Sequence, residues 1–81
     1  MTSAALLGRI TSRADVFSGK PIIRNMRISV EMILSLLEQG ESEQTILADF
    51  PALETDDIRA CFAYPRAVIG RDSFDAVRLA V

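Results

Sequence analysis

Few side chains in this 81-residue chain are of types that carry chemistry. Histidine is absent, so the commonest metal ligand and the usual general base near neutral pH are both missing. Asp56 and Asp57 are adjacent carboxylates, but neighbouring positions on a helix point about 100° apart and cannot converge on one substrate atom. The pair is better suited to the positive end of a helix dipole. We therefore expect no catalytic role for it.

The single cysteine and the lysine beside a glycine are the other candidates. Cys61 falls on an apolar helical face without a histidine to activate it, which predicts a buried small hydrophobic residue rather than a nucleophile. Gly19-Lys20-Pro21 lacks the second glycine, the Lys-Ser/Thr pair and the following helix of a phosphate loop. We expect a protein that is not an enzyme and that uses no metal and no cofactor. One cysteine and no targeting or membrane-spanning run predict a cytoplasmic location.

Charge is distributed unevenly along the chain although the net charge is only −2. Residues 1–30 carry five basic side chains against one acidic, whereas residues 31–60 carry one basic against eight acidic. This polarity favours self-association and contact with nucleic acid. If DNA is bound, the expected contacts are Arg9, Arg13, Lys20, Arg24 and Arg27. The alternative is that Arg24 and Arg27 pair with helix carboxylates such as Glu31, and both interpretations stay open.

The helices and strands that position these residues are arranged around the segment Gly19–Val30. Its β-branched pairs flank a turn in which Asn25 tolerates a positive φ, so a small hairpin is expected between Ile22 and Ile28. Ser29 is well placed to cap a helix over residues 30–39 that ends before Gly40.

Two further helices are expected. Ser42 caps the first of them, which stops at Pro51. Thr55 is the expected N-cap of the second, which ends near Tyr64 because Pro65 follows. Residues 66–81 then contain a break at Gly70 and a short amphipathic helix.

The first 18 residues lack a sustained period and are expected to form an arm, with Ile10-Thr11 as a strand and Val16-Phe17 as an apolar anchor. The fold class is mainly α: an arm with a small β-hairpin, then a three-helix, helix-turn-helix-like bundle, then a short C-terminal segment. Two regions follow, a domain over residues 1–65 and a tail over residues 66–81. The expected core is Ile23, Ile28, Val30, Ile33, Leu34, Leu37, Ile46, Leu47, Phe50, Leu53, Ile58, Cys61 and Phe62.

The order of motifs resembles a known family. The matching residues are Ile10-Thr11, Gly19-Lys20-Pro21-Ile22-Ile23-Arg24, Arg27-Ile28-x-Val30, Ile33-Leu34-x-Leu36-Leu37-x-x-Gly40, Ile46-Leu47-x-Asp49-Phe50-Pro51-x-Leu53 and Asp57-Ile58-Arg59-Ala60. Together they look like a small bacterial family of uncharacterised antitoxin-like domains that is often grouped with VapB-type antitoxins. The resemblance covers roughly residues 10–64. It implies a homeodomain-like, three-helical fold and a PIN-like ribonuclease as the toxin partner.

The chain departs from the family pattern in three places. Asn25-Met26 replaces a usual Gly-Thr, and Asn can adopt the same turn. Ser29 replaces a usual proline before the helix, which exchanges one helix-start residue for another. Pro65 cuts the usual alanine-rich end of the last helix, so the tail is expected to leave in a new direction.

The tail combines cationic and apolar residues that suit the groove of another protein. The resemblance implies that the arginines of this tail meet the acidic metal-binding centre of a PIN-like toxin. The expected toxin contacts are Arg71, Phe74, Val77, Arg78 and Leu79. A tail helix that completes the domain's own core is the alternative. The leading hypothesis is a homodimeric antitoxin of a type II toxin–antitoxin pair that also represses its own operon at operator DNA. A stand-alone DNA-binding regulator and a non-catalytic oligomerising scaffold are the alternatives.

Overall fold

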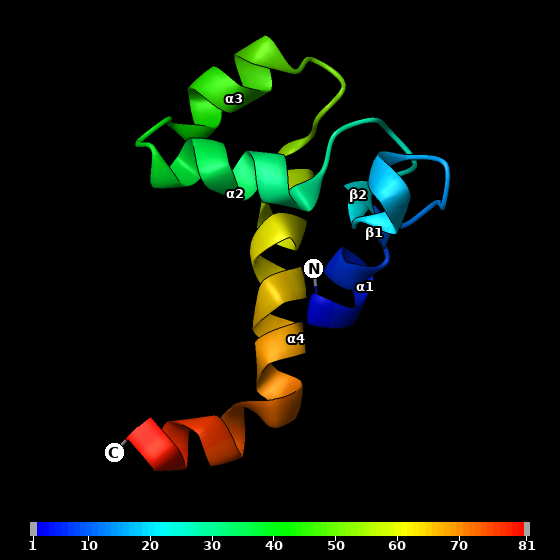
Figure 1. The fold of residues 1–81 in the computed structure, drawn as a ribbon. Helices are drawn as coiled ribbons and strands as arrows, with labels where there is room; N and C mark the ends of the chain where they lie inside the picture. The colour runs from blue at the N-terminus through cyan, green and yellow to red at the C-terminus, as the bar shows by residue number, and fades with distance from the viewer. Residues whose placement is uncertain (1, 81) are drawn as a thin grey trace.

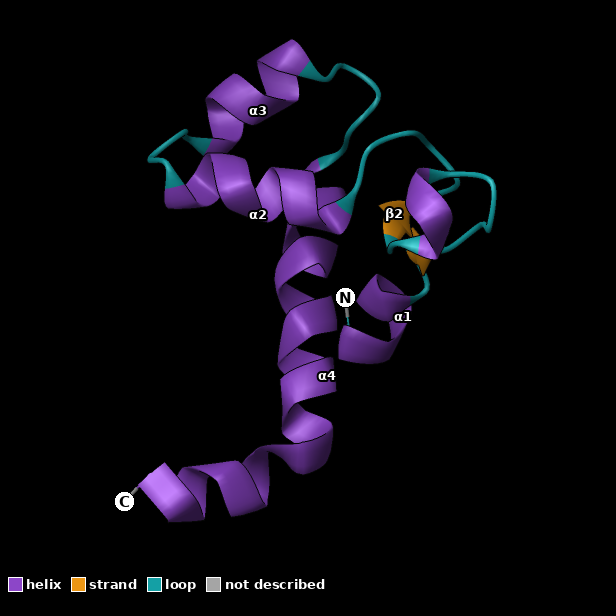
Figure 2. Ribbon diagram, in the orientation of Figure 1, coloured by secondary structure: helices purple, strands orange, loops and turns teal. Residues whose placement is uncertain are grey.

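The chain is mainly helical, with a small antiparallel β-hairpin near its N-terminus (Figure 1). A computed structural model describes the backbone of residues 2–80 and the side chains of residues 2–71. Short loops join the helices and strands (Figure 2). In chain order the elements are α1 (Ser3–Leu7), β1 (Ile10–Thr11), a 3₁₀ turn (Phe17–Gly19), β2 (Ile22–Ile23), α2 (Val30–Glu38), α3 (Glu43–Asp49) and α4 (Thr55–Ala80).

Helix α2 begins and ends where the sequence predicts. The Ser29 hydroxyl accepts a hydrogen bond from the Met32 N–H at 3.0 Å, which satisfies a backbone donor of the first turn. At the other end Gly40 has a φ of +95°, and its N–H donates to the Leu37 carbonyl while the next N–H donates to the Leu36 carbonyl. This pair of bonds is a Schellman motif, which satisfies two carbonyl groups of the last turn.

Helix α3 also follows its sequence signals. The Ser42 hydroxyl accepts from the Thr45 N–H at 3.1 Å, and the helix ends at Asp49, two residues before Pro51. The loop that follows leads to α4, whose first turn lies under α2 (Figure 1).

Helix α4 is longer than the sequence predicts. The expected end near Tyr64 is wrong, because the helix continues through Pro65 and Gly70 to Ala80. Pro65 removes one backbone hydrogen bond, but a single missing bond does not end a helix whose preceding turns are fixed in the core. The predicted N-cap is also wrong by one residue: Thr55 is already helical, so Glu54 holds the cap position.

The β-hairpin is present, but its strands are not the two that flank the predicted turn. Strand β2 pairs with β1, with Ile10 opposite Ile23 and Thr11 opposite Ile22. The segment after the turn still pairs with β2 through an isolated bridge between Ser29 and Ile22 and a bond from the Ile23 N–H to the Ile28 carbonyl at 3.0 Å, but it does not form a strand of its own. Asn25 has the positive φ expected of it, 60°.

The core lies between α2, α3, the start of α4 and β2. The main buried cluster consists of residues that were all expected from the sequence: Ile23, Val30, Ile33, Ile46, Leu53, Ile58 and Cys61. Ile22 and Ala60 are also fully buried and were not expected. Other expected members are partly buried against this cluster: Ile28, Leu34, Leu37, Leu47 and Phe50. Phe62 was wrongly assigned to the core, because its side chain is 51% exposed.

The N-terminal arm is more ordered than expected. The Thr2 hydroxyl accepts from the Ala5 N–H at 3.1 Å and starts helix α1, which the sequence analysis missed. Leu6 then packs on the small residues Ala60 and Ala63 of α4. Val16 is buried as predicted, but its neighbour Phe17 is 44% exposed with a φ of 48°.

Within the described residues, none of the helices has the combination of length and apolar character that crossing a bilayer requires.

The two glycines at helix ends offer a matched test of backbone conformation. Replacing Gly40 by alanine should lower the free energy of unfolding by about 1 kcal/mol, because alanine must adopt a left-handed φ although its methyl group would meet open space. Gly8 has a φ of −62°, so Gly8→Ala should leave stability unchanged or slightly raised. Urea denaturation of both variants checks the difference, and equal losses would contradict the argument.

Candidate functional site

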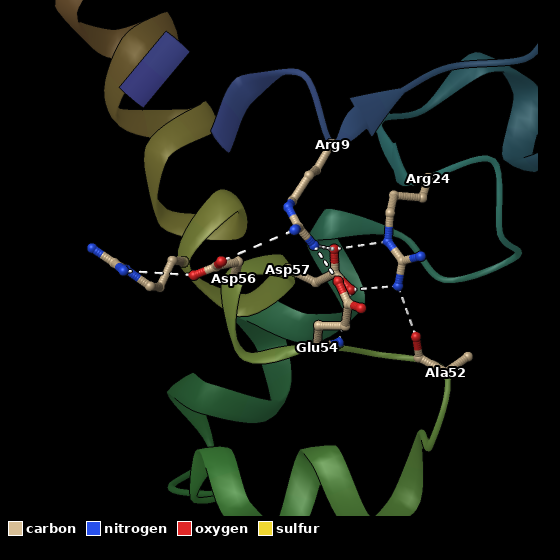
Figure 3. Close-up of polar contacts among 7 residues, drawn as sticks. Arg9, Arg24, Ala52, Glu54, Asp56 and Asp57 are labelled. Carbon is tan, nitrogen blue, oxygen red and sulfur yellow. Dashed lines mark hydrogen bonds and ion pairs between the residues drawn. The ribbon is translucent and has the colours of Figure 1, made fainter. Parts of the chain in front are cut away.

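A buried carboxylate organises the junction between the arm, the turn after β2 and the start of α4. The Asp57 side chain is 0% exposed. Its Oδ1 accepts from Arg9 Nη1 at 2.9 Å and from Arg24 Nε at 3.0 Å. Its Oδ2 accepts from Arg24 Nη2 at 2.7 Å and from the Glu54 backbone N–H at 2.8 Å (Figure 3). Four donors therefore converge on one carboxylate from three segments of the chain.

The Asp57–Glu54 contact is a capping arrangement at the start of α4. Asp57 stands three residues after the N-cap and bonds back to the N-cap N–H, as the acidic residue of a capping box does. Glu54 supplies a second carboxylate, which accepts from Arg9 Nη1 at 2.7 Å. The N-terminus of α4 is thus fixed by the same group that holds the two arginines.

The turn that carries Arg24 is shaped to deliver its side chain. Arg24 and Asn25 have φ values of 44° and 60°, and the Met26 N–H closes the turn on the Ile23 carbonyl at 2.8 Å. Two central residues with positive φ are the mark of a type I′ turn, which normally uses Asn or Gly. The Thr11 hydroxyl supports it by accepting from the Asn25 N–H. From this position Arg24 reaches both Asp57 and the Ala52 carbonyl.

Opposing effects act on the charge of Asp57. Burial tends to raise the pKa of the carboxyl group, but hydrogen bonds from Arg24, the Glu54 N–H and Arg9 outweigh it, and the pKa is lowered. The same bonds raise the pKa of both arginines: those to Glu54 and Asp57 act on Arg9, and those to Asp57 on Arg24. The site is therefore an ion-paired hub that stays charged at neutral pH.

The five cations expected to contact DNA are mostly engaged within the chain. Arg9 and Arg24 belong to the hub, Arg13 pairs with Asp15 at 3.2 Å, and Lys20 pairs with Glu31 at 2.8 Å. Arg27 is exposed and makes no ion pair with a described side chain. Pairing with a helix carboxylate was one of the two interpretations for Arg24, and its partner is Asp57 rather than Glu31.

The residues expected to contact a toxin are only partly described. Arg71 is exposed near the far end of α4. Phe74, Val77, Arg78 and Leu79 lie outside the residues whose side chains the structure describes, although the backbone at these positions belongs to α4.

Cys61 and Asp56 are the other side chains considered for chemistry. Cys61 is fully buried, and burial, aided by the negative charge of Asp57, raises the pKa of its thiol to about 12. Asp56 pairs with Arg59 at 3.5 Å and also lies 4.0 Å from Arg9 Nη2, at the edge of the hub (Figure 3). Across the described part of the chain, the His, Cys, Asp and Glu side chains form no group of three suited to a metal ion.

Sequence reasoning missed that Asp57 is the hub. The signal was present in the spacing of Glu54 and Asp57, which places an acid at the third helical position, and in the unpaired basic excess of residues 1–30. The sequence did not reveal that two distant arginines would reach the same carboxylate. Arg9 and Arg24 lie 48 and 33 positions before Asp57, and both bond to its Oδ1.

Fold and site together define a small, mainly helical domain built around a buried ion-paired carboxylate. The chain belongs to the family described as "Protein of unknown function (DUF433)", whose model matches residues 10–64. The match contains Arg24 and Asp57 but neither Arg9 nor the part of α4 that begins at Pro65.

The chain is also similar to a curated protein. "Uncharacterized protein y4eO" of Sinorhizobium fredii is 29% identical over 58 residues, which are 72% of this chain. The match spans only 26% of that relative's length. No solved structure matches the chain significantly.

Removing the charge of the hub should destabilise the fold. Asp57→Asn keeps the shape of the side chain but leaves Arg24 without its counter-charge, leaves Arg9 paired mainly with Glu54, and puts an amide NH₂ against N–H donors. We expect the free energy of unfolding to fall by about 3 kcal/mol, as when one partner of a buried ion pair is removed. Asp15→Asn, in an exposed pair, is the matched control and should cost less than about 0.5 kcal/mol. Urea denaturation compares the two, and similar losses would refute the role of the hub.

Stability should also depend on pH through Asp57. Because the folded-state pKa is lowered, its contribution is complete above the unfolded-state pKa of 3.8 and is lost as the pH falls through the lower folded-state value. Urea unfolding at a series of pH values should show the free energy of unfolding falling below about pH 4. The Asp57→Asn variant should lose less stability over the same range. Parallel curves for the two proteins would contradict the assignment.

Proposed function

We propose that this chain is the antitoxin of a type II toxin–antitoxin pair, which binds and neutralises a PIN-like ribonuclease. The observation that carries the proposal is the length of α4. Beyond the family domain it continues from Pro65 to Ala80 as a helix, and it bears exposed Val68 and Arg71. A projecting helix with apolar and cationic residues suits the groove of a partner protein.

The far end of this helix is the proposed toxin contact. Arg71, Phe74 and Arg78 are spaced by three and four residues in the sequence, a spacing suited to one face of a helix. A guanidinium group binds a carboxylate through two parallel hydrogen bonds, which suits the acidic metal-binding centre expected of a PIN-like nuclease. Val77 and Leu79 are the apolar residues proposed to accompany them. A cytoplasmic location belongs to this proposal, since the toxin is expected to act on cellular RNA.

Repression of its own operon is the second part of the proposal. We infer a helix-turn-helix-like, three-helical arrangement of α2, α3 and the first half of α4, but the start of α4 is unsuited to read a groove. The acidic residues of that end, Glu54, Asp56 and Asp57, are paired with Arg9, Arg24 and Arg59, so these arginines are already engaged and offer little positive charge to DNA phosphates. Arg27 is the best supported of the expected DNA contacts, since it is exposed and has no ion-pair partner among the described side chains. A regulator without a toxin, or an oligomerising scaffold, would be the function if no toxin is bound.

The proposal predicts that a PIN-like ribonuclease is encoded beside this chain, and that protein is the partner used in the test. We expect the full chain to bind that protein and inhibit its cleavage of RNA. The double variant Arg71→Glu with Arg78→Glu should bind at least about tenfold more weakly, because each reversed charge would face the carboxylates of the nuclease. Titration calorimetry and an RNA cleavage assay measure the two effects.

Arg13→Glu is the matched control, since Arg13 lies on the arm, and it should leave inhibition unchanged. Absence of binding by the full chain would overturn the antitoxin function. Equal binding by the double variant would overturn only the assignment of the contact to the end of α4.

A further inference from the structure

An apolar groove lies between α2 and the middle of α4. Its volume is about 940 Å³, and its apolar lining comes from both helices. The apolar lining residues from the two helices are Val30, Met32, Leu34, Leu36, Tyr64 and Pro65, and Pro21 adds to them from the loop before α2. Figure 1 shows α3 and α4 on opposite sides of α2. Helix α2 thus has apolar residues on the side away from α3 as well as toward the core.

An exposed apolar stripe continues from the edge of this groove along α4. Phe62, Pro65 and Ile69 are spaced by three and four residues, so they lie on one helical face. Phe62 is 51% exposed and Ile69 is 65% exposed. Pro65 belongs both to this stripe and to the lining of the groove, so the groove and the stripe form one continuous surface.

Charges around this surface complement one another. Glu31 and Glu38 lie on the α2 side of the groove, and Glu31 is already paired with Lys20. Glu38 is exposed and has no ion-pair partner among the described side chains. Arg66 is exposed beside the stripe and, within the same part of the chain, is equally without one. Glu38 thus gives the groove a negative charge, and Arg66 gives the stripe a positive one. A two-fold contact requires such complementary surfaces on the same molecule.

We propose that the groove of one copy receives the α4 stripe of a second copy, and that the second copy's groove receives the stripe of the first. The two α4 helices then pack around a two-fold axis close to Pro65, with Ile69 of each copy in the groove of the other and Arg66 of each facing Glu38 of the other. A chain of this length buries only about 60% of its unfolded surface on its own, so such a contact would add substantially to its core. The dimer surface is independent of toxin binding, because it uses residues 62–69 and leaves the end of α4 accessible.

The oligomeric state of the purified chain tests the proposal. Sedimentation velocity over a concentration series should show a dimer for the natural sequence. Ile69→Asp should raise the dimer dissociation constant at least about tenfold, because it places a charge in an apolar groove. Gln44→Asp adds the same charge on the exposed surface of α3 and should leave the constant unchanged. Circular dichroism checks that both variants remain folded.

Charge reversal tests the orientation of the two copies. Arg66→Glu and Glu38→Arg should each weaken the dimer, whereas the double variant should restore it because the two charges are exchanged. Glu41→Arg, an equivalent change in the exposed loop after α2, should have no effect. A monomer at every concentration, which is also the result if another protein fills the groove, would overturn the proposal. So would a dimer unaffected by Ile69→Asp, or a double variant no tighter than the single ones.

Discussion

The buried carboxylate of Asp57 is the constraint on which the rest of the structure depends. A carboxylate without solvent contact is stable only when its charge is balanced and its oxygen atoms are saturated with donors. Arg9 brings the arm to it, Arg24 brings the turn after β2, and the Glu54 N–H brings the start of α4. The basic excess of residues 1–30 and the acidic excess of residues 31–60 are therefore partly an intramolecular match. Much of the charge that would suggest a polyanion partner is used in folding.

This constraint also accounts for strain in the turn. Arg24 occupies a left-handed conformation that costs a residue with a Cβ atom roughly 1–2 kcal/mol, and a glycine would avoid that cost. Glycine could not supply the three hydrogen bonds that Arg24 makes to Asp57 and the Ala52 carbonyl. The strain is thus offset by the ion pair it makes possible. Weakening the hub should loosen the turn as well, although the backbone bonds from the Arg24 N–H to the Arg9 carbonyl and from the Met26 N–H to the Ile23 carbonyl would remain.

The parts of the fold that could be predicted from sequence are those governed by local rules. Ser29, Gly40 and Ser42 act within one turn of themselves, so the bounds of α2 and α3 followed from residue type and spacing. The buried cluster followed from the same periodicity. The hub, the pairing of β1 with β2 and the docking of Leu6 on Ala60 depend on residues far apart in sequence, and no local pattern specifies them. The predicted end of α4 was wrong because it considered only the backbone hydrogen bond lost at Pro65. It left out the core contacts that hold the preceding turns of the helix.

Helix α4 has three parts: first turns that pack in the core, a middle part with an exposed apolar stripe, and a far end that is the proposed toxin contact. Its first turns are fixed by Asp57, Ile58 and Cys61, which are all buried, so substitutions there act on the fold. From Phe62 to Ile69 the exposed side is apolar, and an exposed apolar stripe beside an apolar groove is costly unless another surface covers it. If two copies cover each other there, their α4 helices run in opposite directions and their far ends emerge on opposite sides of the dimer. Each end would then meet its own partner without contacting the other, so a complex of two copies with two toxins is the assembly that the two proposals jointly require.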